Sequence, residues 1–194
     1  MIIITGTPGV GKTEISKALS ARLGASHANL GDIVRNENLV SKAEVEGESL
    51  IIDMRRLSKR IKEIILSSPK DIIIEGHYAP DVVSSNVISN VFVLRRDPEG
   101  LKAEFQARGY DEKKMSENIT SEILDVCLVN AIEKYGIEVV DEIDVTRMSA
   151  CEVIKRILMV LNMQRKPRVG FVDWLGRLDK DGRLDEILSL LEKT

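Results

Sequence analysis

Four short, largely apolar runs along the chain predict buried strands. They lie at residues 2–5, 72–75, 91–94 and 137–140, and β-branched side chains dominate them. A strand that is apolar at every position, rather than at every second one, is typical of a parallel sheet covered on both faces. We therefore expect a parallel sheet with helices packed on each side.

Helical patterns fill the intervals between these runs. Residues 12–23 follow the first run, and residues 53–66 place their apolar positions on one face. Side chains that cap helix starts mark two further helices: Asp97 with Pro98, and Ser149 with Glu152 as a capping box. The alternation of strand and helix along one chain predicts a three-layer α/β fold.

The C-terminal segment, residues 165–194, follows a different pattern from the main domain, residues 1–164. A basic run at residues 165–168 interrupts the preceding helix and would serve as a solvated connector or a weak RNA contact. Apolar residues then recur at helical spacing: Phe171, Trp174, Leu175, Leu178, Leu184, Ile187, Leu188 and Leu191. Such a face must be covered, and we expect it to pack on its own domain, because amphipathic stripes in small domains usually face the core. The alternative is a helix that docks on a partner.

Composition and charge narrow the functional classes. The 194 residues are 43% hydrophobic and 30% charged, which is enough for a full core and argues against bulk disorder. The net charge of −3 excludes a general nucleic-acid coat. The aromatic content of 4% argues against a platform that stacks single-stranded bases.

Cysteine usage and the start of the chain favour the cytoplasm. Cys127 and Cys151 show neither metal-ligand spacing nor a CxxC pattern, so we expect two buried, reduced thiols. The chain begins with a predicted strand instead of a basic leader. Because no apolar run approaches the ~20 residues of a membrane span, we expect no membrane partner.

Residues 6–13 carry the strongest chemical signal, because they match the GxxxxGK[ST] motif at every fixed position. The motif follows a predicted strand and opens a predicted helix, as a phosphate-binding loop requires. Its glycines let backbone N–H groups turn towards phosphate oxygens, and the helix N-terminus favours the same anion. Lys12 would neutralise the β- and γ-phosphates, and the Thr13 hydroxyl would ligate Mg²⁺. No Asn-Lys-x-Asp segment for guanine occurs, so we expect ATP and Mg²⁺.

An acid at the end of a second strand fits the same chemistry. Glu75 ends the predicted strand 72–75, where phosphate-loop enzymes place a side chain that holds the metal or its waters. His77 follows two residues later, within reach of the γ-phosphate region. It would either orient or deprotonate a water, or hold the loop through hydrogen bonds, and the sequence leaves both open.

Three further segments carry a resemblance to a known family. Residues 29–35 (NLGDIVR) resemble the GD-x-x-R element of nucleoside monophosphate kinases. Residues 108–114 (RGYDEKK) and 118–123 (NITSEI) are similar to a stretch of one branch, the adenylate kinase isoenzyme six family. The phosphate-loop sequence GTPGVGKT and the acid-x-His pattern at Glu75 and His77 also match this branch. Archaeal and yeast members of that family act in small-ribosomal-subunit maturation.

This resemblance implies an adenylate-kinase-like fold with a monophosphate-binding segment at about residues 29–52 and a short lid at about residues 107–117. It implies broad nucleoside monophosphate kinase activity, with AMP favoured, together with ATPase activity. The site residues that it implies are Gly9, Gly11, Lys12, Thr13, Glu14 and Arg108 for ATP, with Gly31, Asp32 and Arg35 in the monophosphate segment. It also implies a partner, the universal small-subunit ribosomal protein eleven, and a transient contact with pre-ribosomal RNA.

The chain departs from the family pattern in three ways. Glu75 stands where the branch commonly has aspartate, and Gly76-His77-Tyr78 replaces an arginine of ordinary adenylate kinases. The C-terminal segment also exceeds the length expected of the family. A small arginine set weakens phosphoryl transfer to a monophosphate, since one arginine can change such a rate by orders of magnitude. The alternative function is therefore a dedicated ATPase that acts as an assembly factor.

Overall fold

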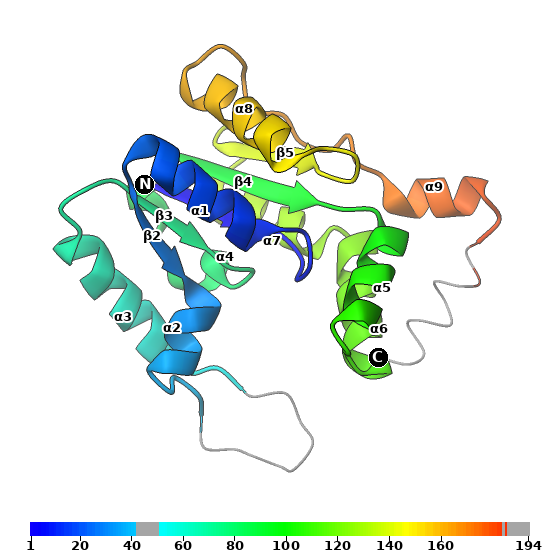
Figure 1. The fold of residues 1–194 in the computed structure, drawn as a ribbon, viewed down its shortest axis with the longest axis horizontal. Coiled ribbons are helices and arrows are strands. Elements are labelled where there is room, and N and C mark those ends of the chain that lie inside the picture. Colours follow the sequence, from blue (N-terminus) through cyan, green and yellow to red (C-terminus); the bar gives the residue numbers. More distant parts are fainter. Residues whose placement is uncertain (42–50, 184, 186–194) are drawn as a thin grey trace.

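The computed structural model describes residues 1–41, 51–183 and 185. Within them, five parallel strands form one sheet in the order β2-β3-β1-β4-β5. The strands are β1 (Ile2–Thr5), β2 (Ser26–Asn29), β3 (Ile72–Glu75), β4 (Asn90–Arg95) and β5 (Val140–Asp144). Helices cover both faces, which confirms the predicted three-layer α/β class (Figure 1).

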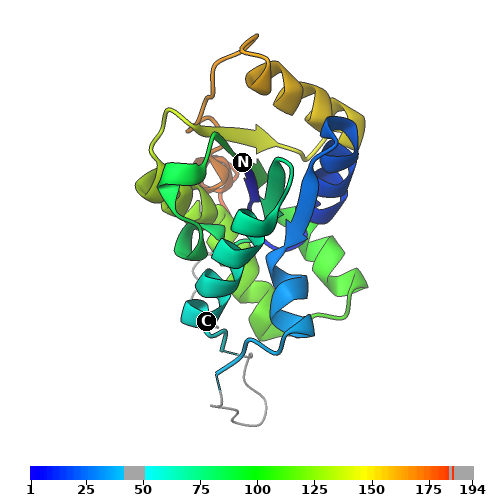
Figure 2. The same ribbon diagram turned by 90° about the vertical axis from the view of Figure 1, so that its left-hand side faces the viewer.

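The helices follow the strands along the chain. They are α1 (Lys12–Leu23), α2 (Leu30–Asn36), α3 (Met54–Ser67), α4 (Ala79–Val82), α5 (Pro98–Ala107), α6 (Glu112–Ile123), α7 (Val126–Tyr135), α8 (Ala150–Leu161) and α9 (Trp174–Lys180), with a short 3₁₀ turn at Ser85–Val87. The predicted caps are present: Asp97 accepts from the Glu99 N–H, and Ser149 with Glu152 forms the capping box. Figure 2 shows α2 and α3 at the β2 side of the sheet.

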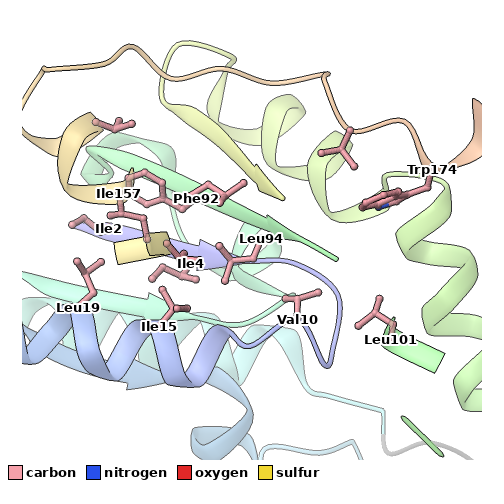
Figure 3. Packing of buried hydrophobic residues seen from close by; sticks show 14 of the residues in the cluster. Ile2, Ile4, Val10, Ile15, Leu19, Phe92, Leu94, Leu101, Ile157 and Trp174 are labelled. Carbon is pink, nitrogen blue, oxygen red and sulfur yellow. The ribbon is translucent and has the colours of Figure 1, made fainter. Parts of the chain in front are cut away.

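Side chains alternate along β1 between two cores. Ile2 and Ile4 face the core that contains α1 and α8, whereas Ile3 faces the core that contains α3, α4 and α7. Figure 3 shows the first core, where Ile15 and Leu19 of α1 pack against β1, and where side chains of β4 and α8 complete the cluster. Burial on both faces explains why the first three residues of β1 and of β3 are all isoleucine.

Two strands differ from the prediction because they contain polar residues. β2, Ser26–Asn29, has no apolar run and was not predicted. β5 occupies Val140–Asp144 instead of residues 137–140, and residues 137–139 form a turn. Asp141 and Glu142 of β5 are fully buried and pair with Arg165 and Arg95. Because these partners are distant in sequence, no local pattern indicates that Asp141 and Glu142 are buried. For that reason the sequence did not predict a strand at these residues.

The described part of the C-terminal segment packs on the rest of the chain. Trp174 is 6% exposed and Leu178 is 4% exposed, and both belong to the α1-side core. In Figure 1, α9 lies at the same end of the sheet as α5 and α6. This agrees with the expected intramolecular packing of Trp174. Leu184, Ile187, Leu188 and Leu191 of the predicted stripe lie outside the described residues.

The basic run agrees with the expected solvated connector at Lys166 and Arg168, which are exposed, but not at Arg165, which is partly buried. Arg165 forms an ion pair with the buried Asp141, and the backbone N–H of Arg168 donates to the same carboxylate at 2.8 Å. The guanidinium groups of Arg168 and Arg156 also lie over the ring of Phe171. These contacts fix the run against β5 and α8, because a buried carboxylate needs donors.

The cysteine expectation is wrong for one of the two residues. Cys151 is exposed on the first turn of α8, whereas Cys127 on α7 is partly buried, and both are free thiols. The apolar face of α8 is instead formed by Val153, Ile157 and Val160. In the part of the chain that the structure describes, no helix has the length and apolar character needed to cross a bilayer.

Candidate functional site

The phosphate loop occupies residues 6–11, between the end of β1 and the start of α1. At Gly6, where φ is +136°, a Cβ would lie 2.3 Å from the carbonyl oxygen of Leu94, so only glycine fits against β4. Gly11 is the N-cap of α1 with φ of +94°, which leaves the first N–H groups of the helix facing the loop. This turn has the backbone geometry expected of a phosphate cradle.

Lys12 folds back into the loop. Its Nζ donates to the carbonyl oxygens of Gly6 at 2.8 Å and Thr7 at 2.9 Å. Burial lowers the pKa of Lys12 to about 8, against the opposing charges of Glu75 and Glu122. The ammonium is thus held where phosphate oxygens would replace two carbonyls as its acceptors, and its charge is sensitive to mildly alkaline pH.

Glu75 lies at the centre of a cluster of polar side chains. It is 1% exposed, and its Oε2 accepts from Thr13 Oγ1 at 3.0 Å. Its Oε1 lies 2.9 Å from both His27 Nε2 and Asn29 Nδ2. The parallel pairing of β2 with β3 places Asn29 opposite Glu75. This arrangement directs one carboxylate oxygen towards the phosphate loop.

Thr13 and Glu75 fit the expected Mg²⁺. Hydroxyl and carboxylate oxygens are the ligand types that Mg²⁺ prefers, and it usually takes only one or two from protein while phosphates and waters supply the rest. The two side chains meet at the start of α1, beside the loop that would hold those phosphates. Sequence reasoning missed His27 and Asn29, because β2 carries no strand signal and its neighbour in the sheet is distant along the chain.

His77 lines a small cavity, and the charge of Lys12 acts on its imidazole. Burial lowers its pKa to about 4, with a smaller contribution from the charge of Lys12, so the imidazole is neutral near pH 7. Its ring centroid lies 3.5 Å from that of Tyr78. The cavity has a volume of about 160 Å³, and its polar lining includes Thr7, His77, Tyr78, Asn118, Ser121 and Asn130. Among the described residues that line it, none is an arginine or a lysine.

A second cavity, of about 200 Å³, borders the end of the loop at Val10 and Gly11. Its wall includes Gly11 and Glu14 at the start of α1, together with Arg96 and Thr146. Arg96 Nη1 donates to the carbonyl oxygen of Gly9 at 3.0 Å, so this guanidinium is fixed directly on the loop. Sequence reasoning missed Arg96 as a site residue; its position just after an apolar strand was the available signal.

Arg108 lies at the lid side of the loop. It is the C-cap of α5, it pairs with Glu104 at 2.7 Å, and its side chain is about half exposed. Its charge acts on Lys12, lowering the pKa of the lysine slightly. The predicted lid, residues 107–117, consists of the turn between α5 and α6 and the first part of α6. Glu104 also lies 3.6 Å from Arg96, so both arginines share one acid.

The predicted monophosphate segment, residues 29–52, is described only in part, because residues 42–50 lie outside the described residues. Asn29 caps α2 by accepting from the N–H of Asp32 at 2.9 Å. Arg35 pairs with Asp32 at 2.5 Å, where both side chains are at least half exposed, and Gly31 lies beside this guanidinium. Arg35 also opposes the burial that raises the pKa of Tyr78, which places its charge towards the His77 cavity.

The structure therefore brings Lys12, Thr13, Glu75 and His77 together around the loop. Arg35 and Arg108 lie at the rim, each paired with a surface acid. Such exposed pairs contribute little energy and can be exchanged for a phosphate at low cost.

Comparison with known proteins was made on sequence and on structure. A family model described as "AAA domain" matches residues 2–125. A protein of Thermococcus onnurineus named "Putative adenylate kinase" is 36% identical, over 93% of this chain and 94% of its own length. A protein of Methanocaldococcus jannaschii with the same name is 39% identical, over 89% and 92%. The first alignment extends into the C-terminal segment, which corrects the expectation that this segment exceeds the family.

Solved structures support the fold. The YorR protein of Bacillus subtilis, solved in complex with phosphorylated GDP, aligns with a TM-score of 0.58 and 17% identity, over 84% of this chain and 96% of its own. Shikimate kinase from Bacteroides thetaiotaomicron aligns with a TM-score of 0.55 and 17% identity, over 83% and 97%.

Proposed function

The chain belongs to the archaeal adenylate kinase family, and on this premise we propose that it catalyses ATP + NMP ⇌ ADP + NDP, with AMP as the favoured acceptor. The observation that carries the proposal is the pair of cavities that border one phosphate loop, one lined by Thr7 and Pro8 and the other by Val10 and Gly11. In this proposal the Arg96 cavity would take the nucleoside part of ATP, and the His77 cavity would take the acceptor phosphate. Transfer between two nucleotides requires two compartments that meet at one point.

The chain's own residues would act mainly by position and charge. The loop N–H groups and Lys12 would hold the β- and γ-phosphates and stabilise the charge that develops during transfer. Mg²⁺, held by Thr13 and through water by Glu75, would neutralise phosphate charge when bound. Arg108 would bind ATP phosphates from the lid side. Arg35 would bind the acceptor phosphate bidentately after leaving Asp32.

We also propose ATP hydrolysis as a second activity, favoured by the composition of the His77 cavity. Its described lining offers amide, hydroxyl and imidazole groups together with the carboxylate of Asp81, but no arginine or lysine, so it suits a water. A pKa of about 4 makes His77 a weak base, so it would orient a water by hydrogen bonding more than it would remove a proton. If ATP hydrolysis is much faster than transfer to a monophosphate, the protein is a dedicated ATPase.

The biological role that we propose is late maturation of the small ribosomal subunit in the cytoplasm. This role rests on the resemblance of residues 108–114 and 118–123 to the adenylate kinase isoenzyme six family. In this role the partners would be the universal small-subunit protein eleven and pre-ribosomal RNA. Affinity capture with the ATP-bound protein, followed by identification of the bound proteins and RNA, tests this role. Capture that is equal with a Lys12→Met variant would count against an ATP-dependent assembly function.

One experiment separates kinase from ATPase. Purified protein is mixed with Mg-ATP, with and without AMP, and ADP and phosphate are measured in the same samples. ADP that forms in excess of phosphate when AMP is present supports transfer between nucleotides. Phosphate release that is equal with and without AMP supports the dedicated ATPase. A Lys12→Met control should lose at least ~100-fold in both, the scale of removing one electrostatic stabiliser.

A further inference from the structure

Glu122, in the last turn of α6, is a buried acid that contacts the phosphate loop. It is 1% exposed, and its Oε2 accepts a 2.5 Å hydrogen bond from Thr7 Oγ1. Its Oε1 accepts from three groups: Arg95 Nε at 2.8 Å, the backbone N–H of Arg96 at 3.1 Å, and Trp174 Nε1 at 3.0 Å. One carboxylate therefore joins the phosphate loop, the end of β4 and the C-terminal segment.

The C-terminal segment supplies hydrogen-bond donors to this cluster, in which one buried guanidinium faces more than one buried carboxylate. Arg95 is 1% exposed and serves two buried carboxylates, Glu122 and Glu142. A carboxylate in the interior needs hydrogen-bond donors beyond a shared cation. The C-terminal segment supplies three: the N–H groups of Gly170 and Phe171 on Glu142, at 2.8 and 3.2 Å, and Trp174 Nε1 on Glu122.

Glu122 is connected to Lys12 through a single residue, Thr7. Thr7 donates its hydroxyl to Glu122, and its carbonyl oxygen accepts from Lys12 Nζ at 2.9 Å. The loop beside Thr7 is held by Arg96, whose backbone N–H is bound to Glu122 and whose side chain is bound to Gly9. A shift of the Glu122 carboxylate would therefore move both sides of the phosphate loop.

We propose that Glu122 is a positioning residue of the phosphate loop, and that the C-terminal segment takes part in ATP binding by holding Glu122 through Trp174. This rests on the proposed function only in taking the loop as the ATP site; it does not depend on which acceptor is used. Trp174 acts through Glu122 and touches no substrate.

The test is a comparison of nucleotide affinity, measured by titration calorimetry with Mg²⁺ and a non-hydrolysable ATP analogue. Trp174→Phe keeps an aromatic ring in the core but removes the N–H donor. We expect its Kd to rise about fivefold or more, from the loss of one hydrogen bond to a charged group. Thr7→Val removes the hydroxyl at nearly constant shape and should raise Kd at least as much. The double variant should resemble Thr7→Val instead of multiplying the two effects, because both act through Glu122.

Leu178→Ala is the matched control. Leu178 is buried in the same helix and packs in the same core, but it contributes no donor to Glu122. It should lower the melting temperature without changing Kd. If Trp174→Phe lowers the melting temperature but leaves Kd within twofold of wild type, or if the double variant shows the product of the single effects, the proposal is wrong. A wild-type chain that binds no analogue would instead refute the proposed function.

Fluorescence gives a second route if Trp174→Phe does not fold. Trp174 is the only tryptophan in the sequence. Saturation with the analogue should change its emission in the wild type, and the change should disappear in Thr7→Val at saturation. An emission change that is equal in both proteins would show that Trp174 senses the nucleotide without Thr7 and Glu122, and would overturn the proposal.

Discussion

The charge of Lys12 should control how well the free protein captures ATP, and its lowered pKa makes this testable by pH. Burial brings that pKa down to about 8, so the ammonium is charged at pH 7 and neutral at pH 9. Between these values the charged fraction falls from about nine-tenths to about one-tenth, a loss of about tenfold. Because kcat/KM reports the ionisation of the free enzyme, kcat/KM for ATP should fall about tenfold over this range.

The value of kcat should respond less. Once ATP is bound, phosphate charges beside Lys12 favour the ammonium and raise its pKa, so kcat should stay nearly constant to pH 9. The assay is initial ADP formation at saturating AMP, at constant ionic strength and free Mg²⁺, from pH 6.5 to 9. His77 should add no further limb in this range, because its pKa of about 4 keeps it neutral throughout.

Two variants separate Lys12 from other groups. Lys12→Arg remains charged over the whole range, so its kcat/KM, although lower, should be independent of pH. Lys12→Met should be at least ~100-fold less active at pH 7 and should show no alkaline limb, so its kcat/KM deficit relative to wild type should narrow about tenfold by pH 9. A wild-type kcat/KM that stays constant up to pH 9, or an alkaline limb that persists in Lys12→Arg, would refute the assignment of this ionisation to Lys12.

Three other substitutions test the remaining roles. His77→Ala should depress phosphate release more than AMP phosphorylation, measured in one preparation; equal losses with a lower melting temperature would mean that His77 only holds its loop. Arg35→Ala should raise the KM for AMP about tenfold or more while the KM for ATP stays unchanged, since its exposed pair with Asp32 contributes at most about 1 kcal/mol; an unchanged AMP dependence would remove Arg35 from the acceptor site. Glu75→Gln should raise the Mg²⁺ concentration needed for half-maximal activity, with nucleotide affinity in the absence of metal unchanged, and an unaltered Mg²⁺ dependence would contradict its role.

Local patterns in the sequence identified the parts of the site that lie close together in the chain. Strand β1 with the phosphate loop that follows it, strand β3 with Glu75 at its end, and the capped starts of α5 and α8 are each encoded within a short stretch of sequence. Their physical causes are short-range: backbone freedom at Gly6 and Gly11, side-chain caps, and continuous apolar runs. The three-layer α/β class followed from their order.

Tertiary structure decided how distant residues meet. The order β2-β3-β1 places His27 and Asn29 on Glu75, although these residues are separated by more than forty positions. β2 lacks an apolar run, and no local pattern shows which strand will lie beside it. The pairing in space, and hence the orientation of the Glu75 carboxylate, exists only in the folded sheet.

Buried charges were the feature that the sequence indicated least. Glu122, Asp141 and Glu142 look like surface acids in the sequence, and Arg165 looks like part of a solvated connector. In the fold the three acids are buried. Arg95, Arg165 and N–H groups of the C-terminal segment are their ion-pair and hydrogen-bond partners. An isolated charge is excluded from the interior by the cost of losing water, and only a partner brought from elsewhere in the chain removes that cost. The sequence alone therefore determined the phosphate-binding chemistry, whereas the tertiary structure decided which distant acids and donors surround it.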